Sequence, residues 1–205
     1  QSYIDASAVF FPPFDGLSIV TLGLVSTSAT YLAEGQACVA AVMATGFTAR
    51  VLTPAPLEST IDPTNATGYC HLAMVAGHPA AVYNISGESL RYCRANDPLG
   101  ASWGTPEVLD TNHIWESSNL IIVNGNPAVS YYDSNHDDLM FIRATDSLGT
   151  SWFPPMAVYT NGDTGRYPSM QVIGDYPAIS FKDDTRNELY YVRSTNIIGR
   201  GWPAP

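Results

Sequence analysis

Short apolar runs alternate with polar clusters along the last two thirds of the chain. In a representative stretch, four runs rich in Leu, Ile, Val, Tyr and Phe are separated by clusters of Asn, Asp and Gly. These runs span residues 119–123, 128–132, 139–143 and 152–159. Such runs are typical of strands joined by tight turns, and two prolines in the last run suit an outer strand because proline donates no ladder hydrogen bond. No segment has a helical period, so the pattern predicts an all-β fold.

The pattern occurs three times, with a period of about 49 residues. Each copy has a proline in its second strand, a leucine and an arginine in its third strand, and then a glycine and a tryptophan. The equivalent residues are Pro79, Pro127 and Pro177; Leu90, Leu139 and Leu189; Arg94, Arg143 and Arg193; Gly100, Gly149 and Gly199; and Trp103, Trp152 and Trp202. Four short strands in each period are typical of a propeller blade. We therefore predict a β-propeller-like array of four-stranded antiparallel blades over residues 67–110, 111–161 and 162–205.

Residues 1–66 fit the repeat less well and are predicted to form an irregular β region. Residues 35–42 resemble the turn and second strand of a repeat and residues 50–54 resemble an outer strand, but the strand between them is missing. Two interpretations stay open, a degenerate first blade or a separate segment for capping or assembly. The last repeat stops before its outer strand would be complete, and residues 2–10 are apolar enough to fill that gap. The array is then either a closed ring of four blades or an open row.

A turn after the third strand of each repeat carries a recognisable motif. Its copies read ANDPLGASW from Ala95, ATDSLGTSW from Ala144 and STNIIGRGW from Ser194. They resemble the Asp-box of sialidase-like propellers, whose usual pattern is Ser-x-Asp-x-Gly-x-Thr-Trp, with one more residue here between the acidic position and the glycine. The resemblance covers residues 67–205 and implies a β-propeller architecture. In that family the Asp-box lies away from the catalytic pocket, so the resemblance predicts a fold and not an activity.

Structural roles are expected for the repeated residues of this turn. The carboxylate or amide accepts N–H groups of its own turn, the glycine adopts a positive φ, and the tryptophan packs the turn onto its blade. These residues are Asp97, Gly100, Trp103, Asp146, Gly149, Trp152, Asn196, Gly199 and Trp202. The arginines Arg94, Arg143 and Arg193 precede the turn in every repeat. We expect them to brace that turn instead of clustering around a substrate carboxylate, as three arginines do in a sialidase.

Composition excludes several kinds of partner. The 205 residues include nine Lys and Arg against nineteen Asp and Glu, giving a net charge of −10, and Lys182 is the only lysine. Nucleic acids and anionic membranes need clustered basic residues, and no apolar run reaches the roughly 18 residues that span a bilayer, so neither partner is expected. The start at Gln1 and the low-charge composition favour an extracellular or cell-surface protein. The sequons at Asn65 and Asn84 are candidate glycosylation sites.

Residues that could catalyse a reaction or bind a metal have simpler explanations. The candidate carboxylates lie in hairpin loops, where solvated polar residues are expected, and are Asp133, Asp137, Asp138, Asp183, Asp184 and Glu188. The loop 133–138 has oxygen ligands at alternate positions but lacks the glycine and the glutamate of a calcium loop. The histidines show no ligand spacing, and the three cysteines, Cys38, Cys70 and Cys93, allow one disulfide or three buried thiols. We predict no catalytic residue, no metal and no cofactor.

Aromatic residues remain as ligand candidates. Most occupy equivalent strand positions, which indicates packing within the blades. Trp115 and Tyr167 lie just before the predicted innermost strands and are not required by the repeat, so we select them as ligand-binding residues. The first hypothesis is a non-enzymatic extracellular module for adhesion or for recognition of glycans or proteins. The second is a structural subunit that assembles with copies of itself by strand exchange, and the third is a fragment of a glycoside hydrolase.

Overall fold

The chain divides into two compact units, Gln1–Leu57 and Glu58–Pro205. The computed structural model describes residues 41–43, 46–48, 57–64, 66–85, 89–112 and 117–204. In the first unit, the described part is a hairpin in which β1 (Ala41–Met43) pairs antiparallel with β2 (Gly46–Thr48). The predicted closing strand at residues 2–10 and most of the region 1–66 lie outside the described residues. The described residues contain strands and turns and no helix, which confirms the all-β prediction; they therefore include no helix that could cross a membrane.

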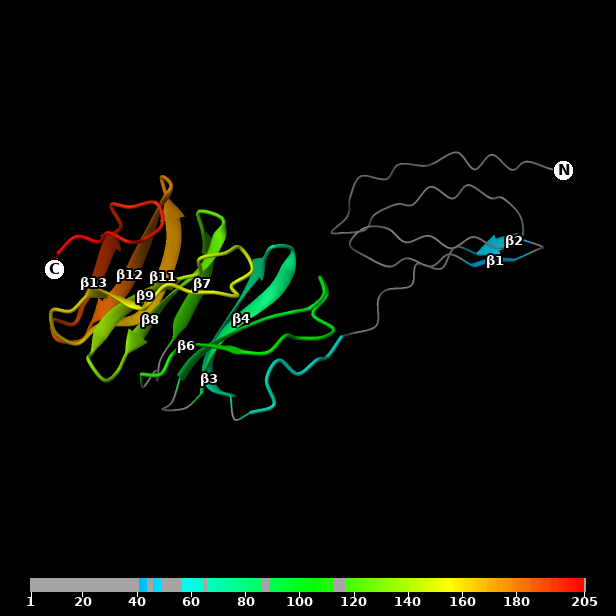
Figure 1. The fold of residues 1–205 in the computed structure, drawn as a ribbon, viewed down its shortest axis with the longest axis horizontal. Coiled ribbons are helices and arrows are strands. Elements are labelled where there is room, and N and C mark those ends of the chain that lie inside the picture. The colour runs from blue at the N-terminus through cyan, green and yellow to red at the C-terminus, as the bar shows by residue number, and fades with distance from the viewer. Residues whose placement is uncertain are drawn as a thin grey trace. The chain divides into compact units, whose positions relative to one another are not determined.

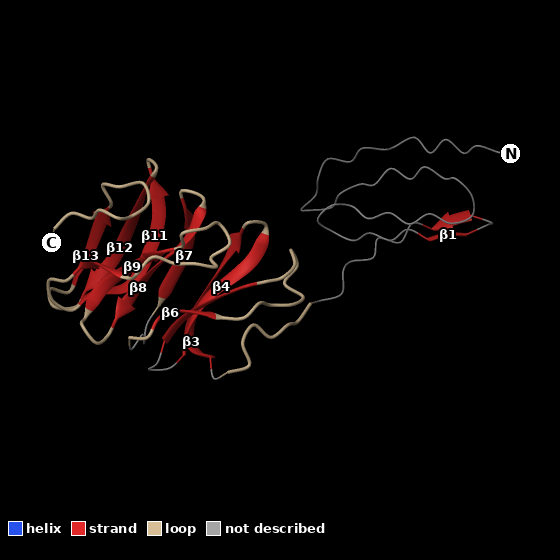
Figure 2. Cartoon of the chain, viewed as in Figure 1, coloured by secondary structure: helices blue, strands red, loops and turns tan. Residues whose placement is uncertain are grey.

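Three antiparallel sheets follow one another along the second unit, as Figures 1 and 2 show. Blade 1 is β3 (Ala66–Val75), β4 (His78–Ile85), β5 (Ser89–Arg94) and β6 (Glu107–Asp110). Blade 2 is β7 (Ser118–Val123), β8 (Asn126–Asp133), β9 (Asp138–Arg143) and β10 (Met156–Tyr159). Blade 3 is β11 (Thr164–Ile173), β12 (Tyr176–Asp183) and β13 (Glu188–Arg193). In each sheet the strands lie side by side in chain order, and the described part of blade 3 has three strands.

Tight two-residue turns join the first and second strands of every blade. Both residues of each turn have positive φ, as in the type I′ turns whose twist matches that of the flanking strands. The pairs are Ala76-Gly77 (45° and 77°), Asn124-Gly125 (45° and 82°) and Gly174-Asp175 (56° and 70°). These turns fix the register, so that Val75 pairs with His78, Val123 with Asn126, and Ile173 with Tyr176.

Blade 2 lies between the other two blades and shares an apolar core with each of them. The core between blades 1 and 2 includes Val82, Leu90 and Tyr92 on one side and Val129 and Tyr131 on the other. The core between blades 2 and 3 has the equivalent composition and includes Leu139, Phe141, Ile179, Phe181 and Val192. Because strand residues alternate between the two faces of a sheet, blade 2 presents one apolar face to blade 1 and the other to blade 3.

The turns after the third strands, which resemble the Asp-box and are called Asp-box turns below for that resemblance, also contact the preceding blade. A Cβ atom on Gly149 would lie 2.6 Å from the Tyr92 ring, and Gly199 has the same relation to the Phe141 ring. The Trp152 ring meets Tyr92 edge-on, with centroids 5.1 Å apart. The sequence predicted that the tryptophan packs the turn onto its own blade. The structure corrects this for Trp152 and also for Trp202, which packs against Phe141, because the turn follows the third strand and projects toward the neighbouring sheet.

Residues 58–64 cover the other face of blade 1, which points away from blade 2. Ile61 packs against a buried cluster that includes Ala81 and Tyr83, and the Tyr83 hydroxyl donates to Asp62 Oδ2 at 2.7 Å. One repeat later, Leu109 packs into the core between blades 1 and 2, and the Tyr131 hydroxyl donates to Asp110 Oδ2 at 2.5 Å. The segment 58–64 therefore makes on blade 1 the contacts that the end of β6 makes on blade 2.

Candidate functional site

Each Asp-box carboxylate binds backbone groups of its own turn, as the sequence predicted. Asp97 accepts N–H groups from Leu99, Ala101 and Ser102 at 2.9–3.1 Å. These backbone donors stabilise the charged form and hold the pKa of Asp97 below its usual value.

The other two copies of the turn follow the same plan. Burial alone would raise the pKa of Asp146, but N–H groups of Leu148, Thr150 and Ser151 bind its carboxylate and lower the pKa. Asn196 accepts one such bond, from Ile198 N–H at 2.9 Å. The glycines of the three turns have φ of 74°, 77° and 74°, as the predicted roles require. The polar side chains of all three turns are therefore engaged in hydrogen bonds with their own backbone.

Two of the repeated arginines brace a turn, but not the turn that the sequence suggested. The Arg143 guanidinium donates to the carbonyl oxygens of Val123 at 3.0 Å and Asn124 at 2.9 Å, in the turn between β7 and β8. Arg143 pairs with Ala128 on β8, so its long side chain reaches across the sheet to the turn that precedes β8.

The same contacts recur in blade 1 and change in blade 3. Arg94 donates to Val75 and Ala76 carbonyls, each at 2.9 Å. Arg193 instead lies over the Tyr176 ring, 5.5 Å from its centroid. The three arginines therefore occupy separate blades in equivalent places and do not converge on a common site.

Other sequence candidates are corrected or lie outside the described residues. Asn84 is only 2 % exposed within β4, so a glycan cannot be attached there without disrupting the sheet. Asn65 and Trp115 lie outside the described residues. Cys70 is exposed and Cys93 buried, and both are free thiols; Cys38 is outside the described part.

Hairpin carboxylates that were expected to be solvated are buried at two positions. Asp133 and Asp183 are 1 % and 0 % exposed. Asp133 accepts the Asn135 N–H at 2.9 Å and faces the His136 ring nitrogen at 2.8 Å, which raises the pKa of His136. Asp183 accepts the Arg186 N–H at 2.9 Å and pairs with its guanidinium at 2.6 Å. Each carboxylate therefore binds groups within its own hairpin. Separately, the described residues form no group of three or more His, Cys, Asp or Glu side chains that could hold a metal ion.

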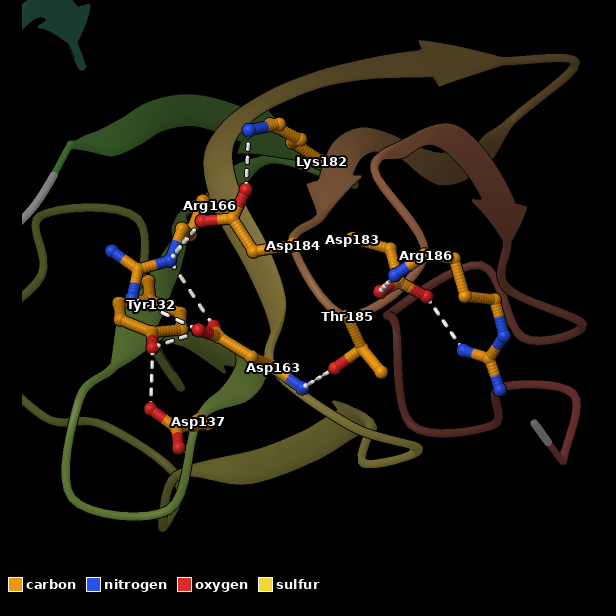
Figure 3. A network of polar contacts seen from close by, with 9 residues as sticks. All are labelled: Tyr132, Asp137, Asp163, Arg166, Lys182, Asp183, Asp184, Thr185 and Arg186. Carbon is orange, nitrogen blue, oxygen red and sulfur yellow. Dashed lines mark hydrogen bonds and ion pairs between the residues drawn. The ribbon is translucent and has the colours of Figure 1, made fainter.

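A polar cluster joins blades 2 and 3 beside these hairpins, and Figure 3 shows its members. We call it the loop-end cluster, and it consists of Tyr132, Asp137, Asp163, Arg166, Lys182 and Asp184. Arg166 is at its centre, because Nε and Nη2 each lie 3.1 Å from an Asp163 oxygen and Nε lies 2.7 Å from Asp184 Oδ2. Its guanidinium also stacks 4.6 Å from the centroid of the Tyr132 ring.

The remaining contacts fix the cluster further. The Tyr132 hydroxyl lies 2.6 Å from Asp137 Oδ1 and 2.8 Å from Asp163 Oδ1, and Lys182 forms an ion pair with Asp184. Burial alone would raise the pKa of Asp163, but hydrogen bonds from Arg166 and Tyr132 lower it. Burial and the bonds to the two carboxylates raise the pKa of Tyr132. Asp163 is therefore held as a carboxylate and Tyr132 as a neutral phenol.

Tyr167 projects from this cluster on a strained piece of backbone. Its φ is 53°, a left-handed value that a tyrosine rarely adopts, and it precedes Pro168, which restricts the backbone further. The pairing of β11 with β12 shifts register between Arg166 and Ser169, so β11 has an extra residue there. The side chain of Tyr167 is nevertheless 57 % exposed. The bulge aims an aromatic ring outward, directly after the arginine that anchors the cluster.

The sequence selected Tyr167 for its place outside the repeat, and the structure shows that Arg166, directly before it in the chain, belongs to a charged cluster that sequence reasoning missed. Arg166, Lys182 and Asp163 were not proposed as site residues. One signal was present, since Lys182 is the only lysine in a chain poor in basic residues. The spacing of these residues along the chain gave no indication that they meet.

Comparison with known proteins gives the fold. No protein-family model matches the sequence, and no curated protein matches it. Among solved structures, the chain is similar to a polysaccharide lyase of family PL25, an ulvan lyase bound to -[GlcA(1-4)Rha3S]-, with a TM-score of 0.51 and 13 % identity over 65 % of this chain. A second PL25 ulvan lyase structure gives a TM-score of 0.51 and 12 % identity over 65 % of this chain. The GH43B protein of the Bacteroides ovatus xyloglucan PUL gives a TM-score of 0.47 and 16 % identity over 64 %.

These similarities define an all-β, propeller-like fold of antiparallel three- and four-stranded sheets. The chain covers 36 % of each ulvan lyase and 27 % of the GH43B protein.

Proposed function

We propose that the second unit is an extracellular glycan-recognition module and that Tyr167 is its principal contact with a sugar ring. The observation that carries this proposal is that Tyr167 is exposed on a strained bulge, directly after Arg166 of the loop-end cluster. Backbone strain of this kind costs of order 1–3 kcal/mol and is concentrated at functional sites. An exposed tyrosine face suits the apolar face of a sugar, and nearby polar groups suit its hydroxyls.

The charges of the cluster favour a neutral sugar. Arg166 and Lys182 are balanced by Asp163 and Asp184, with which they form ion pairs. The cluster therefore offers hydrogen-bond donors and acceptors with little net attraction for an anion. The net charge of −10 repels polyanions at longer range. We expect neutral oligosaccharides to bind more tightly than oligosaccharides that contain uronic acid or sulfate.

Binding is favoured over catalysis at this site because its carboxylates are engaged in ion pairs. A glycosidase uses one protonated carboxyl group and one ionised carboxylate on either side of the bond to be cleaved. Asp163 and Asp184 both face Arg166, and the pKa of Asp163 is lowered, so this carboxyl group does not hold a proton. Two of the structural neighbours are lyases and one is a GH43 protein, so cleavage of each bound glycan should be assayed alongside its binding.

The proposal is tested by screening the full chain against neutral and acidic oligosaccharides and then measuring affinities for Tyr167→Gly. Loss of the ring should weaken binding about tenfold or more, the equivalent of about 1.4 kcal/mol. Glycine tolerates positive φ, so the same change should leave the free energy of unfolding unchanged or raise it by about 1 kcal/mol. Loss of binding without loss of stability separates a ligand contact from a structural one.

A matched control is Tyr69→Ala, which removes a tyrosine that is 47 % exposed on β3, far from the loop-end cluster in the sequence. This variant should bind like the wild type. If no glycan binds, or if Tyr167→Gly and the wild type bind equally well, the proposed site is wrong.

A further inference from the structure

Among the described residues, no fourth strand pairs with the outer edge of blade 3, whereas the other two blades carry one there. In blade 1, β6 pairs with β5, and in blade 2, β10 pairs with β9. Among the described residues, β13 pairs only with β12. A strand edge of this kind presents free N–H and C=O groups that can pair with another strand.

The face of blade 3 that points away from blade 2 is apolar, and no other part of the described second unit covers it. Leu189 is 82 % exposed, whereas the equivalent Leu90 and Leu139 are both 0 % exposed. Tyr191 is 61 % exposed, whereas its equivalents Tyr92 and Phe141 are each 2 % exposed. In blades 1 and 2, the Tyr92 and Phe141 rings are covered by the turn after the third strand of the next blade, which carries Gly149 or Gly199, and Leu139 lies against Gly165 of β11. The same side chains therefore lack their usual cover in blade 3.

A cleft of about 450 Å³ follows this open edge, lined by Tyr159, Tyr190, Tyr191, Arg193 and Pro203 among others. Tyr190 and Tyr191 point to opposite faces of β13, so a cleft that both residues line must run along the strand edge. An outer strand occupies the equivalent place in the other blades. The cleft therefore has the location that an added β-strand requires.

The chain contains a segment that resembles an outer strand but pairs with no strand among the described residues. Residues 58–64 place Ile61 and Asp62 on blade 1 as Leu109 and Asp110 are placed on blade 2. Asp62 also accepts the Thr64 N–H at 2.8 Å, as Asp110 accepts the Asn112 N–H at 3.0 Å. The segment thus contacts blade 1 in the way that an outer strand contacts the blade after it. Among the described residues, it forms no backbone ladder with the third strand of a preceding blade.

The open edge and this segment cannot meet within one copy of the second unit. The segment lies on the free face of blade 1, β13 belongs to blade 3, and blade 2 separates them, as the row of strand labels in Figure 1 shows. We propose that blade 3 of one copy docks on blade 1 of a second copy, whose residues 58–62 supply the missing outer strand. This inference does not depend on the proposed glycan site.

The pairing in blade 1 predicts the register. There, Tyr92 pairs with Glu107 and Leu90 pairs with Asp110. In the docked pair, β13 takes the place of β5, and residues 59–62 of the second copy take the place of residues 107–110. Tyr191 would then pair with Ser59, and Leu189 with Asp62. The Tyr191 ring would then face the turn that contains Gly100 and Trp103. In the other two turns the glycine lies against an aromatic ring of the preceding blade, whereas the nearest atoms to Gly100 belong to Trp103 and Pro79 of its own blade. Leu72 and Met74 of the second copy, 62 % and 57 % exposed, add apolar surface.

Such an interface joins two different surfaces, so each copy keeps one free surface of each kind. Interfaces of this type generate closed rings or open filaments. Because each copy has a net charge of −10, association should strengthen as salt screens the repulsion between copies.

The test is the mass of the full chain measured over a range of concentrations by light scattering and sedimentation, with electron microscopy of the largest species. We expect association that depends on concentration. Leu189→Asp should raise the dissociation constant roughly a hundredfold, since it replaces a buried leucine by an unpaired carboxylate at the interface. Val108→Asp is the matched control, because Val108 is 53 % exposed on β6 and lies outside the proposed contact.

A second measurement, disulfide cross-linking, tests the proposed pairing of residues 59 and 191. Full chains with Ser59→Cys and with Tyr191→Cys, both with Cys38 and Cys70 replaced by Ser, are mixed under mild oxidation. A mixed disulfide should form, and neither variant alone should cross-link. A chain that stays monomeric at every concentration and salt level, or oligomers that Leu189→Asp leaves intact, would overturn the proposal.

Discussion

Gly149 offers a direct measure of how strongly the Asp-box turn holds two blades together. Its φ is 77°, and a Cβ atom at this position would lie 2.6 and 2.8 Å from two ring carbons of Tyr92 and 2.9 Å from its hydroxyl oxygen. Gly149→Ala therefore introduces two separate costs. A non-glycine residue at positive φ costs about 1–2 kcal/mol, and forcing a methyl group into a packed contact costs about 1–3 kcal/mol more.

Gly125→Ala isolates the first cost. Gly125 has a φ of 82°, and a Cβ atom there would meet nothing within 4 Å. We expect Gly149→Ala to lower the free energy of unfolding by about 1–3 kcal/mol more than Gly125→Ala, the difference being the steric term alone. Urea unfolding followed by tryptophan fluorescence provides the measurement, since Trp152 itself packs on Tyr92.

A double-mutant cycle gives a stricter test of the same contact. Replacing Tyr92 by Leu shortens the side chain that a new methyl group at position 149 would meet. The double variant should therefore be more stable than the sum of the single effects predicts. Equal losses for Gly149→Ala and Gly125→Ala, together with additive effects in the cycle, would show that the turn does not bind the preceding blade.

Two further predictions concern Arg143, which binds the carbonyls of a turn in blade 2, and Asp62, which joins residues 58–64 to blade 1. Arg143→Met should lower the free energy of unfolding by about 2–3 kcal/mol, because it leaves the Val123 and Asn124 carbonyls without their charged donor; Arg193→Met should have a much smaller effect, and equal losses in urea unfolding would contradict the assigned role. Burial alone would raise the pKa of Asp62, but bonds from Thr64 and Tyr83 and the charge of Arg91 lower it from 3.8 to about 2. Since the folded pKa is depressed, this contribution is present above pH 4 or so and is lost as the pH falls toward 2. Asp62→Asn should remove that part of the acid dependence; unfolding curves that fall equally steeply with pH in both proteins would refute it.

Local sequence was sufficient for the features whose partners lie within a few residues. The period, the hairpins and the hydrogen bonds of Asp97 and Asp146 could be predicted because each of these turns closes on its own backbone. The pattern of strand residues also predicted successive antiparallel sheets and an incomplete outer strand in the last repeat, and the described part of blade 3 has three strands.

Contacts between segments far apart in the chain required the tertiary structure. Tyr191 occupies the strand position equivalent to Tyr92 and Phe141, so the repeat alone predicts that it packs within a blade. It is instead 61 % exposed, because burial at this position depends on the next blade and not on the strand that carries the residue. Arg143 was assigned to the wrong turn because the sheet register decides which carbonyls its side chain reaches.

The candidate site shows the same division most clearly. From the sequence alone, Tyr167 was an aromatic residue outside the repeat, and this was enough to select it but not to explain it. The tertiary structure placed Arg166 between Asp163 and Asp184, and put Tyr167 on a bulge at positive φ. Strand periodicity determines which residues share a face, whereas the packing of one blade on the next determines which charges meet and which side chains remain exposed.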